Sequence, residues 1–262
     1  MALPYYFPGV TLLITHYNRS SSLERLLATF RSLNCRFDDI VVADDASKPE
    51  HIEKLKSLQS EYNFRLITSP VNKGLGNNLN KGQDAVTTKY TLYVQEDFVP
   101  AAIFPAHFKD ALQFMNEDDS LDYIRFWALA DSYPNLKPYK KGFSEMVFSY
   151  WSMNHFKFYQ YTDTPHIRRS NFFEKFGRYK EGIYGDLMDY KMAISFLQKK
   201  GKGLFYEEYT TLFGHENSPD EPSTMRPLIN WRQKRNFFMD LLRNVYLKYK
   251  LIKCTLDIKF MR

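Results

Sequence analysis

Cysteine is almost absent from this sequence of 262 residues, in which only Cys35 and Cys254 occur. This excludes a disulfide framework and a cysteine-rich zinc site, because both need several cysteines at short spacings. So little cysteine is typical of a protein kept in a reducing compartment, and we therefore expect a cytoplasmic location.

Long apolar runs are absent as well. No stretch approaches the ~18 apolar residues that a membrane-spanning helix needs, so an integral membrane protein is not expected. The first ten residues, MALPYYFPGV, contain two prolines and no basic residue before an apolar run, which is not the pattern of a secretory signal.

The common phosphate-binding fingerprints are also missing. There is no GxxxxGK(S/T) sequence, and Gly74 and Gly76 do not follow a predicted strand in a GxGxxG pattern. A phosphorylated ligand would have to be held in another way, most simply through Mg²⁺ or Mn²⁺ bound to carboxylates.

A net positive charge is absent except at one end of the chain. Residues 230–262 hold nine basic and two acidic residues, a net charge of +7 against +6 for the whole sequence, which leaves residues 1–229 at −1. A nucleic-acid-binding surface on the main part of the chain is therefore not expected, and we predict no nucleic-acid partner.

Strand-like and helix-like segments alternate in the first hundred residues. Apolar, β-branched strand patterns occur at 10–15, 40–43, 64–68 and 91–94, and helical patterns at 21–33, from 47 onward and at 74–86. Ser21 with Glu24, and Ser47 with Glu50, have the spacing of capping boxes. Such units predict an α/β fold with a mostly parallel, doubly wound central sheet flanked by helices.

The second half is less regular and predicts strands at 123–128 and 204–213 and a helix through 187–197. The three prolines of 217–227 indicate a linker. We therefore predict one domain at 1–227, with halves 1–100 and 101–227, followed by a basic helical tail at 228–262.

Polar side chains follow each of the first four predicted strands, where an open parallel sheet binds its ligands. Each one alone is more often a helix cap or a solvated loop residue. Four consecutive strand ends of this kind indicate a ligand site. The segments are T-H-Y-N-R, A-D-D-A-S, N-K-G-L-G-N-N-L-N-K-G and Y-V-Q-E-D-F.

In this order, the four segments resemble glycosyltransferase family 2, the inverting GT-A group that uses nucleotide-diphosphate sugars. The resemblance covers residues 10–100 and resumes more loosely over 165–215. It implies a donor half at 1–100 and an acceptor half at 101–227. It places nucleotide-sugar binding on Thr15, Tyr17, Arg19, Asp44, Asp45, Lys73, Asn80, Gln95, Glu96 and Arg169.

The family's Asp-x-Asp metal motif falls on Gln95, Glu96 and Asp97, so the first aspartate is replaced. The resemblance implies that Asp97 and His215 bind Mn²⁺ or Mg²⁺. The catalytic base is implied at Gly185–Asp186, where the second acid of a Glu-Asp pair is kept. Asp186 is the first candidate and Asp189, one turn later, is the reserve. The alternative for Asp186 is an acid that only stabilises a helix N-terminus.

Aromatic residues offer a further surface. Trp127, Trp151 and the stretch 143–161 are more often core than ligand-binding, and stacking on a sugar is the alternative.

The basic tail has an apolar stripe of Trp231, Phe238, Leu241, Leu242, Val245 and Tyr249. The stripe either packs on the domain or lies on the anionic inner face of a membrane.

The leading hypothesis is an inverting, metal-dependent glycosyltransferase acting on a glycan or lipid-linked acceptor in surface polysaccharide synthesis. The first alternative is a degenerate protein that binds nucleotide sugar without turnover, suggested by Gln95 and Gly185. The second is a protein that binds a membrane surface or nucleic acid through its tail.

Overall fold

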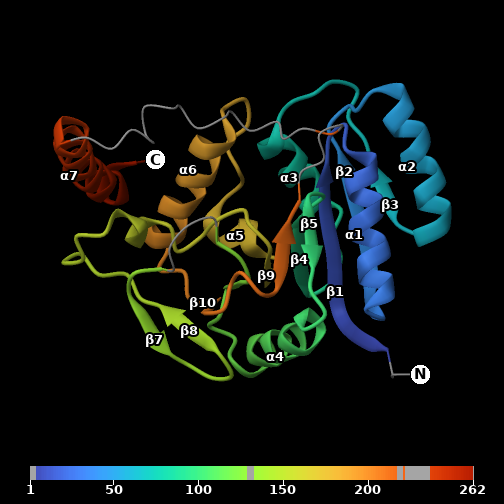
Figure 1. Ribbon diagram of the computed structural model, residues 1–262, viewed down its shortest axis with the longest axis horizontal. Coiled ribbons are helices and arrows are strands. Elements are labelled where there is room, and N and C mark those ends of the chain that lie inside the picture. The colour runs from blue at the N-terminus through green and yellow to red at the C-terminus, as the bar shows by residue number, and fades with distance from the viewer. Residues whose placement is uncertain (1–3, 129–132, 217–220, 222–236, 262) are drawn as a thin grey trace.

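The computed structural model describes residues 4–128, 133–216, 221 and 237–261, with side chains in the last segment from residue 241. Its centre is a nine-stranded sheet in the order β3-β2-β1-β4-β9-β6-β10-β8-β7 (Figure 1). The strands are β1 Tyr5–His16, β2 Cys35–Asp44, β3 Arg65–Ile67, β4 Tyr90–Gln95, β6 Tyr123–Arg125, β7 Leu136–Pro138, β8 Phe143–Met146, β9 His166–Arg169 and β10 Gly203–Tyr206.

Strands β8 and β9 run opposite to the other strands of the sheet. The parallel pairing of β1 with β2 and β4, predicted from the alternating pattern, is confirmed. A separate antiparallel pair consists of β5 Phe98–Pro100 and β11 Phe213–His215. The predicted strand at 204–213 is therefore wrong as one unit, because turns separate β10 from β11.

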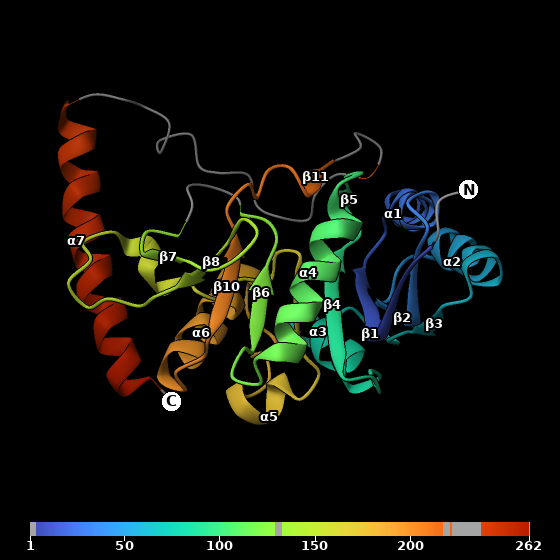
Figure 2. The same ribbon diagram turned by 90° about the horizontal axis from the view of Figure 1, so that it is seen from below.

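Helices cover both faces of the sheet (Figures 1 and 2). They are α1 Ser20–Ser32, α2 Pro49–Tyr62, α3 Leu75–Asp84, α4 Phe104–Glu117, α5 Phe172–Phe176, α6 Gly185–Gln198 and α7 Phe237–Phe260, with a short 3₁₀ helix η1 at His155–Phe158. Side chains of β1 alternate between the two layers, as strand geometry requires. Leu12 and Ile14 face the core under α1, α2 and α4, and Leu13 faces the core under α3, α5 and α6.

Both predicted capping boxes are wrong. Helix α1 begins at Ser20 without a side-chain cap from its own first turn. Its free N–H groups at Ser21 and Ser22 are instead bound by the carboxylate of Glu221, at 2.8 and 2.9 Å. Helix α2 begins at Pro49, and Ser47 lies outside it with its hydroxyl directed at Asp44.

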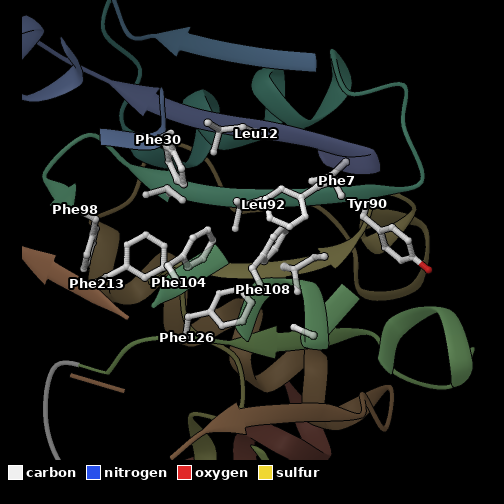
Figure 3. Close-up of a cluster of buried hydrophobic side chains, with 14 of the residues drawn as sticks. Phe7, Leu12, Phe30, Tyr90, Leu92, Phe98, Phe104, Phe108, Phe126 and Phe213 are labelled. Atoms are coloured by element: carbon white, nitrogen blue, oxygen red, sulfur yellow. The ribbon is translucent and has the colours of Figure 1, made fainter. Parts of the chain in front are cut away.

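A row of phenylalanines in contact connects the core to the sheet edge where β4 ends (Figure 3). Phe104 contacts Phe108 and Phe213, with ring centroids 5.2 and 4.9 Å apart. Phe98 is next along the same row, 6.3 Å from Phe213. Because Phe98 and Phe213 belong to β5 and β11, this packing fixes the strand pair beside β4.

Helix α7 packs on α6 and η1 through Leu251, Cys254 and Ile258, which meet Phe158 and Tyr190. The expected tail helix is thus present, although Trp231, the side chain of Phe238 and the boundary at 227/228 lie outside the described residues. No helix in the described part of the chain combines the length and apolarity that a membrane crossing requires.

Two glycines in the segment before and within α3 have structural roles that other residues would fill less well. Gly74 precedes the helix with a φ of +85°, which glycine adopts without steric cost. A Cβ on Gly82 would lie 2.7 Å from Leu13 Cδ1 and 3.0 Å from the Cβ of Ala43, so glycine lets α3 approach β1 and β2 closely.

We expect Gly82→Ala to lower the free energy of unfolding by about 1–3 kcal/mol, because the added methyl overpacks this contact. Urea unfolding followed by circular dichroism measures the change. The matched control is Gly185→Ala, where a Cβ meets nothing within 4 Å. Equal stability of the two variants would contradict the close α3–β1 packing.

Candidate active site

The pairing of β5 with β11 brings together Asp97 and His215, which are 118 positions apart in the sequence. His215 lies opposite Phe98 in the ladder, and the N–H of Glu216 donates to the backbone oxygen of Asp97 at 2.9 Å. His215 Nε2 is 3.1 Å from Asp97 Oδ2. The structure therefore brings together the two metal ligands implied by the resemblance.

Arg19, at the end of β1, is the cation nearest this carboxylate. Its Nη1 is 2.7 Å from Asp97 Oδ2 and 3.6 Å from Glu96 Oε1. Burial acts to raise the pKa of Asp97, but hydrogen bonds from His215 and Arg19 outweigh it and hold the pKa below its usual value. Burial and repulsion by Asp97 raise the pKa of Glu96 to about 8. One oxyanion is thus stabilised, and its neighbour is favoured in the protonated form.

The donor set beside Asp97 fits a divalent cation. Asp97 Oδ1 is buried and has no hydrogen-bond partner among the described residues, so one hard oxygen is available for a metal. The imidazole of His215 suits Mn²⁺. Among the described residues, no group of three His, Cys, Asp or Glu side chains forms a complete metal site. A cation here would therefore also need phosphate or water oxygens.

The ends of β1 and β2 are joined by a buried polar network. His16 Nδ1 donates to Asp44 Oδ1 at 2.8 Å, and the N–H of Ser47 donates to Asp44 Oδ2 at 3.0 Å. Burial acts to raise the pKa of Asp44, and these bonds outweigh it, so its pKa is lowered. Asp44 is fully buried, and its carboxylate holds the strand ends together.

Asp45 orders the loop before α3. Its two oxygens accept the N–H groups of Lys73, at 2.9 Å, and Gly74, at 2.7 Å. Lys73 itself is exposed, while Tyr17 and Gln95 are half-buried. These side chains lie along the strand ends where a nucleotide was expected.

Two predicted binding residues have other contacts. The side chain of Asn80 bonds both the N–H and the oxygen of Tyr179 at 3.0 Å, so it holds the segment before α6. Arg169 lies opposite Tyr90, at the end of β4 away from Asp97, and its guanidinium donates to backbone oxygens of Leu121 and Met115. We leave Arg169 out of the site because it fixes the end of α4.

Three acids, Asp163, Asp186 and Asp189, lie close enough to interact at the start of α6. Asp186 is exposed in the first turn of α6, and Asp189 is half-buried one turn later. Asp189 Oδ1 accepts the N–H of Asp163 at 2.9 Å. Burial and repulsion by Asp163 raise the pKa of Asp189 well above its usual value, and the charge of Arg125 opposes this. Burial and repulsion by Asp186 and Asp97 raise the pKa of Asp163 to about 6.

Sequence reasoning missed Asp163. Strand β9 is antiparallel to β4, with His166 opposite Tyr93, so residues before β9 lie at the same edge as residues after β4. A strand was not predicted at 166–169, so the residues that precede it were not considered as part of the site. The T-D-T-P-H segment was the available signal, because a proline after polar residues is common where a strand begins.

Trp127 forms an aromatic wall beside Asp97 together with Phe98 and His215. Its ring centroid is 5.0 Å from Phe98 and 5.8 Å from His215. Its place beside His215 makes it a candidate for stacking on a sugar. Trp151, by contrast, is 92% exposed in the loop beside α7 and does not belong to this aromatic wall.

Comparisons with known proteins agree with this geometry. The model of the family described as Glycosyl transferase family 2 matches residues 11–180. The poly-beta-1,6-N-acetyl-D-glucosamine synthase of Staphylococcus epidermidis is 25% identical over 91 residues, which are 35% of this chain and 22% of that protein. The enzyme of that name from Staphylococcus aureus strain COL is 24% identical over 91 residues, with the same coverage. This chain thus spans about a fifth of the length of these relatives.

Solved structures show the fold. TarS residues 1–349 from S. aureus in complex with UDP-GlcNAc superposes with a TM-score of 0.59 at 14% identity, covering 82% of this chain and 61% of that one. The mannosyltransferase PcManGT from Pyrobaculum calidifontis, in complex with GDP-Man and Mn²⁺, gives 0.52 at 14% identity, covering 77% and 56%. The expected GT-A arrangement is confirmed.

The acid pair predicts a pH-dependent cost in stability. Asp163 has a folded pKa of about 6, above the unfolded value of about 3.9. Its contribution to the free energy of unfolding is therefore fully present below about pH 4 and is lost as pH rises through about 6. We expect Asp163→Asn to be more stable than the wild type at pH 8, with a smaller difference at pH 4.

Urea unfolding at both pH values measures this difference. The control is Glu53→Gln on the exposed side of α2. An Asp163→Asn effect that is the same at pH 4 and pH 8 would show that the folded structure does not raise the pKa of Asp163.

Proposed function

Because the chain belongs to glycosyl transferase family 2, we propose that it is an inverting glycosyltransferase that moves a sugar from a nucleoside-diphosphate sugar to a hydroxyl group. One observation carries this proposal. A buried carboxylate with a free oxygen, Asp97 Oδ1, lies at the same sheet edge as an acid pair with raised pKa values, Asp163 and Asp189. The first suits a cation–diphosphate group, and the second suits proton acceptance.

For the donor we propose a uridine diphosphate sugar, supported by the complex of TarS with UDP-GlcNAc. Tyr17 and Lys73 are accessible along the strand ends, whereas Thr15 is buried and its hydroxyl lies 3.0 Å from the hydroxyl of Tyr93, so Thr15 is left out of the donor site. Asp44 and Asp45 act on the binding loops through the contacts described above. Arg19 lies where its charge can meet a phosphate, next to Asp97.

Asp97 and His215 would hold Mn²⁺ or Mg²⁺. A bound cation would neutralise charge on the diphosphate leaving group. The protein would supply the two ligands and keep them together through the β5–β11 ladder. Without a cation, Asp97 would repel the diphosphate.

For the catalytic base we propose Asp189 rather than Asp186. The N–H of Asp163 holds one oxygen of Asp189, which leaves the other oxygen to accept a proton. In the reaction, the acceptor oxygen forms a bond to the anomeric carbon while Asp189 takes its proton. The bond from that carbon to the diphosphate breaks, and the electron pair leaves with the diphosphate. A raised pKa makes the carboxylate a stronger base.

For the acceptor we propose a hydroxyl of a glycan or lipid-linked saccharide in surface polysaccharide synthesis at the inner face of a membrane. The support is the likeness over 91 residues to poly-beta-1,6-N-acetyl-D-glucosamine synthases.

The first test concerns the cation. We expect Asp97→Ala to abolish Mn²⁺-dependent UDP binding, and His215→Ala to weaken it less, because Asp97 offers the harder ligand. Isothermal titration of UDP with and without Mn²⁺ measures both. Phe98→Leu is the matched control for packing at the same strand. Unchanged Mn²⁺-dependent binding by Asp97→Ala would contradict the assignment.

The second test separates the two acids. We expect Asp189→Asn to lower kcat by about 10²-fold or more without changing UDP affinity, because the amide cannot accept the proton. Asp186→Asn is the control and should change kcat by less than about tenfold. The reverse order would move the base to Asp186. UDP-sugar binding without any transfer by the wild type would favour the degenerate binding protein.

A further inference from the structure

Helix α7 has two apolar faces, and among the residues that the structure describes only one of them packs against the rest of the protein. The inner face, which includes Leu251, Cys254 and Ile258, meets α6 and η1. Tyr190 of α6 donates to Asp257 at 2.6 Å, and Gln198 Nε2 donates to the oxygen of Met261 at 2.8 Å. These contacts fix which side of α7 faces the domain.

The outer face of α7 is apolar along its described length. Residues separated by three or four positions share one side of a helix. The large apolar residues opposite Cys254 are between 46% and 74% exposed; they are Leu241, Leu242, Val245, Tyr249, Ile252, Leu256 and Phe260. Figure 2 shows α7 at the margin of the molecule, beyond α6. These side chains include four residues of the apolar stripe predicted from the sequence.

The charges beside this outer face are positive. Within 241–261 there are five basic residues and one acid. Lys248 and Lys259 are exposed on the outer side, whereas Lys250 and Lys253 lie over the rings of Tyr159 and Tyr190 on the side of the domain. That acid, Asp257, points to the inner side, where it is bonded to Tyr190 and Lys253. A second copy of α7 would set lysines against lysines, whereas an anionic surface would attract them.

The loop at 150–153 extends this surface. Trp151 and Met153 are exposed by 92% and 73%. Between the loop and α7 is a hollow of about 430 Å³, lined in part by Tyr150, Met153, Lys157, Lys248, Ile252 and Leu256. Lys248 is exposed at this hollow, whereas Lys157 is buried and donates to the backbone oxygen of Tyr150 at 2.8 Å. Apolar walls beside an exposed lysine suit an anionic lipid, which has an acyl chain and a charged headgroup. Exposed tryptophan is also typical of the membrane interface.

We propose that the outer face of α7, together with the 150–153 loop, docks on an anionic lipid bilayer with the helix in the plane of the surface. The apolar side chains enter the headgroup boundary, and the lysines contact lipid phosphates. This surface does not include the strand ends that carry Asp97, so its binding can be measured apart from the transferase activity.

The experiment is co-sedimentation of the full chain with two kinds of vesicle. One is phosphatidylcholine alone, and the other contains about one third phosphatidylglycerol, which gives a strongly anionic surface. We expect binding to the anionic vesicles at low salt and release as ionic strength rises. The triple variant Val245→Asn, Ile252→Asn and Leu256→Asn should bind at least about tenfold more weakly, since it loses exposed apolar groups. Because these residues are exposed, the fold should be kept, and circular dichroism checks this.

Two further comparisons separate charge from apolar contact. Lys248→Gln with Lys259→Gln should weaken binding and flatten its salt dependence. The charge-matched control is Lys56→Gln with Lys109→Gln, on α2 and α4, and the apolar control is Ile103→Asn. Both controls should leave vesicle binding and its salt dependence unchanged. Lipids with brominated acyl chains should quench the tryptophan fluorescence of the vesicle-bound wild type. This quenching should be lost in Trp151→Phe.

Equal sedimentation of the wild type and the triple variant would overturn the proposal. So would a wild-type dimer in light scattering that the triple variant abolishes without any vesicle binding, since the face would then join two copies. Absence of wild-type binding to the anionic vesicles at low salt would also overturn it. UDP titration of the same samples separates these results from a failure of the proposed enzyme activity.

Discussion

The cost of burying Asp97 governs the arrangement of the candidate site. A buried carboxylate is unfavourable unless cations and hydrogen bonds compensate it. Here Arg19 comes from the end of β1 and His215 comes from β11, so both halves of the chain contribute. The phenylalanine row behind β5 and β11 keeps these groups together. The remaining free oxygen is what makes the group available to a ligand.

A second electrostatic feature opposes stability across the same edge. Burial and repulsion by Asp163 raise the pKa of Asp189, and the charge of Arg125 offsets only part of this; burial and repulsion by Asp186 and Asp97 raise the pKa of Asp163. Acids that are kept together at such a cost are more typical of functional sites than of packing. The pKa of a coupled pair belongs to both members. The acceptor-side acid is therefore better described as a pair than as a single base.

The sequence predicted the half of the fold that rests on local periodicity. β1, β2 and β4 are continuous apolar runs, and their parallel order follows from the helices between them. It did not predict β9, whose antiparallel place between β4 and β6 depends on contacts distant in sequence. Both capping boxes had the right spacing, but tertiary partners replaced them: Glu221 binds the start of α1, and Ser47 bonds Asp44. For the site, motif order located Asp97 and His215, whereas Asp163 needed the sheet order.

Helix α6 links the candidate site to the tail. Asp189 and Tyr190 are adjacent on it, and successive helical residues point about 100° apart. Asp189 consequently meets Asp163, while Tyr190 meets Asp257 of α7. Any surface that holds the outer face of α7 therefore also fixes the orientation of the helix that carries the proposed base. An acceptor anchored in that surface would reach the acid pair from the side of α6, and a donor would enter from the ends of β1, β2 and β4. The two substrates would thus approach from different elements, a helix and the strand ends, and meet between the acid pair and Asp97, as a direct displacement requires.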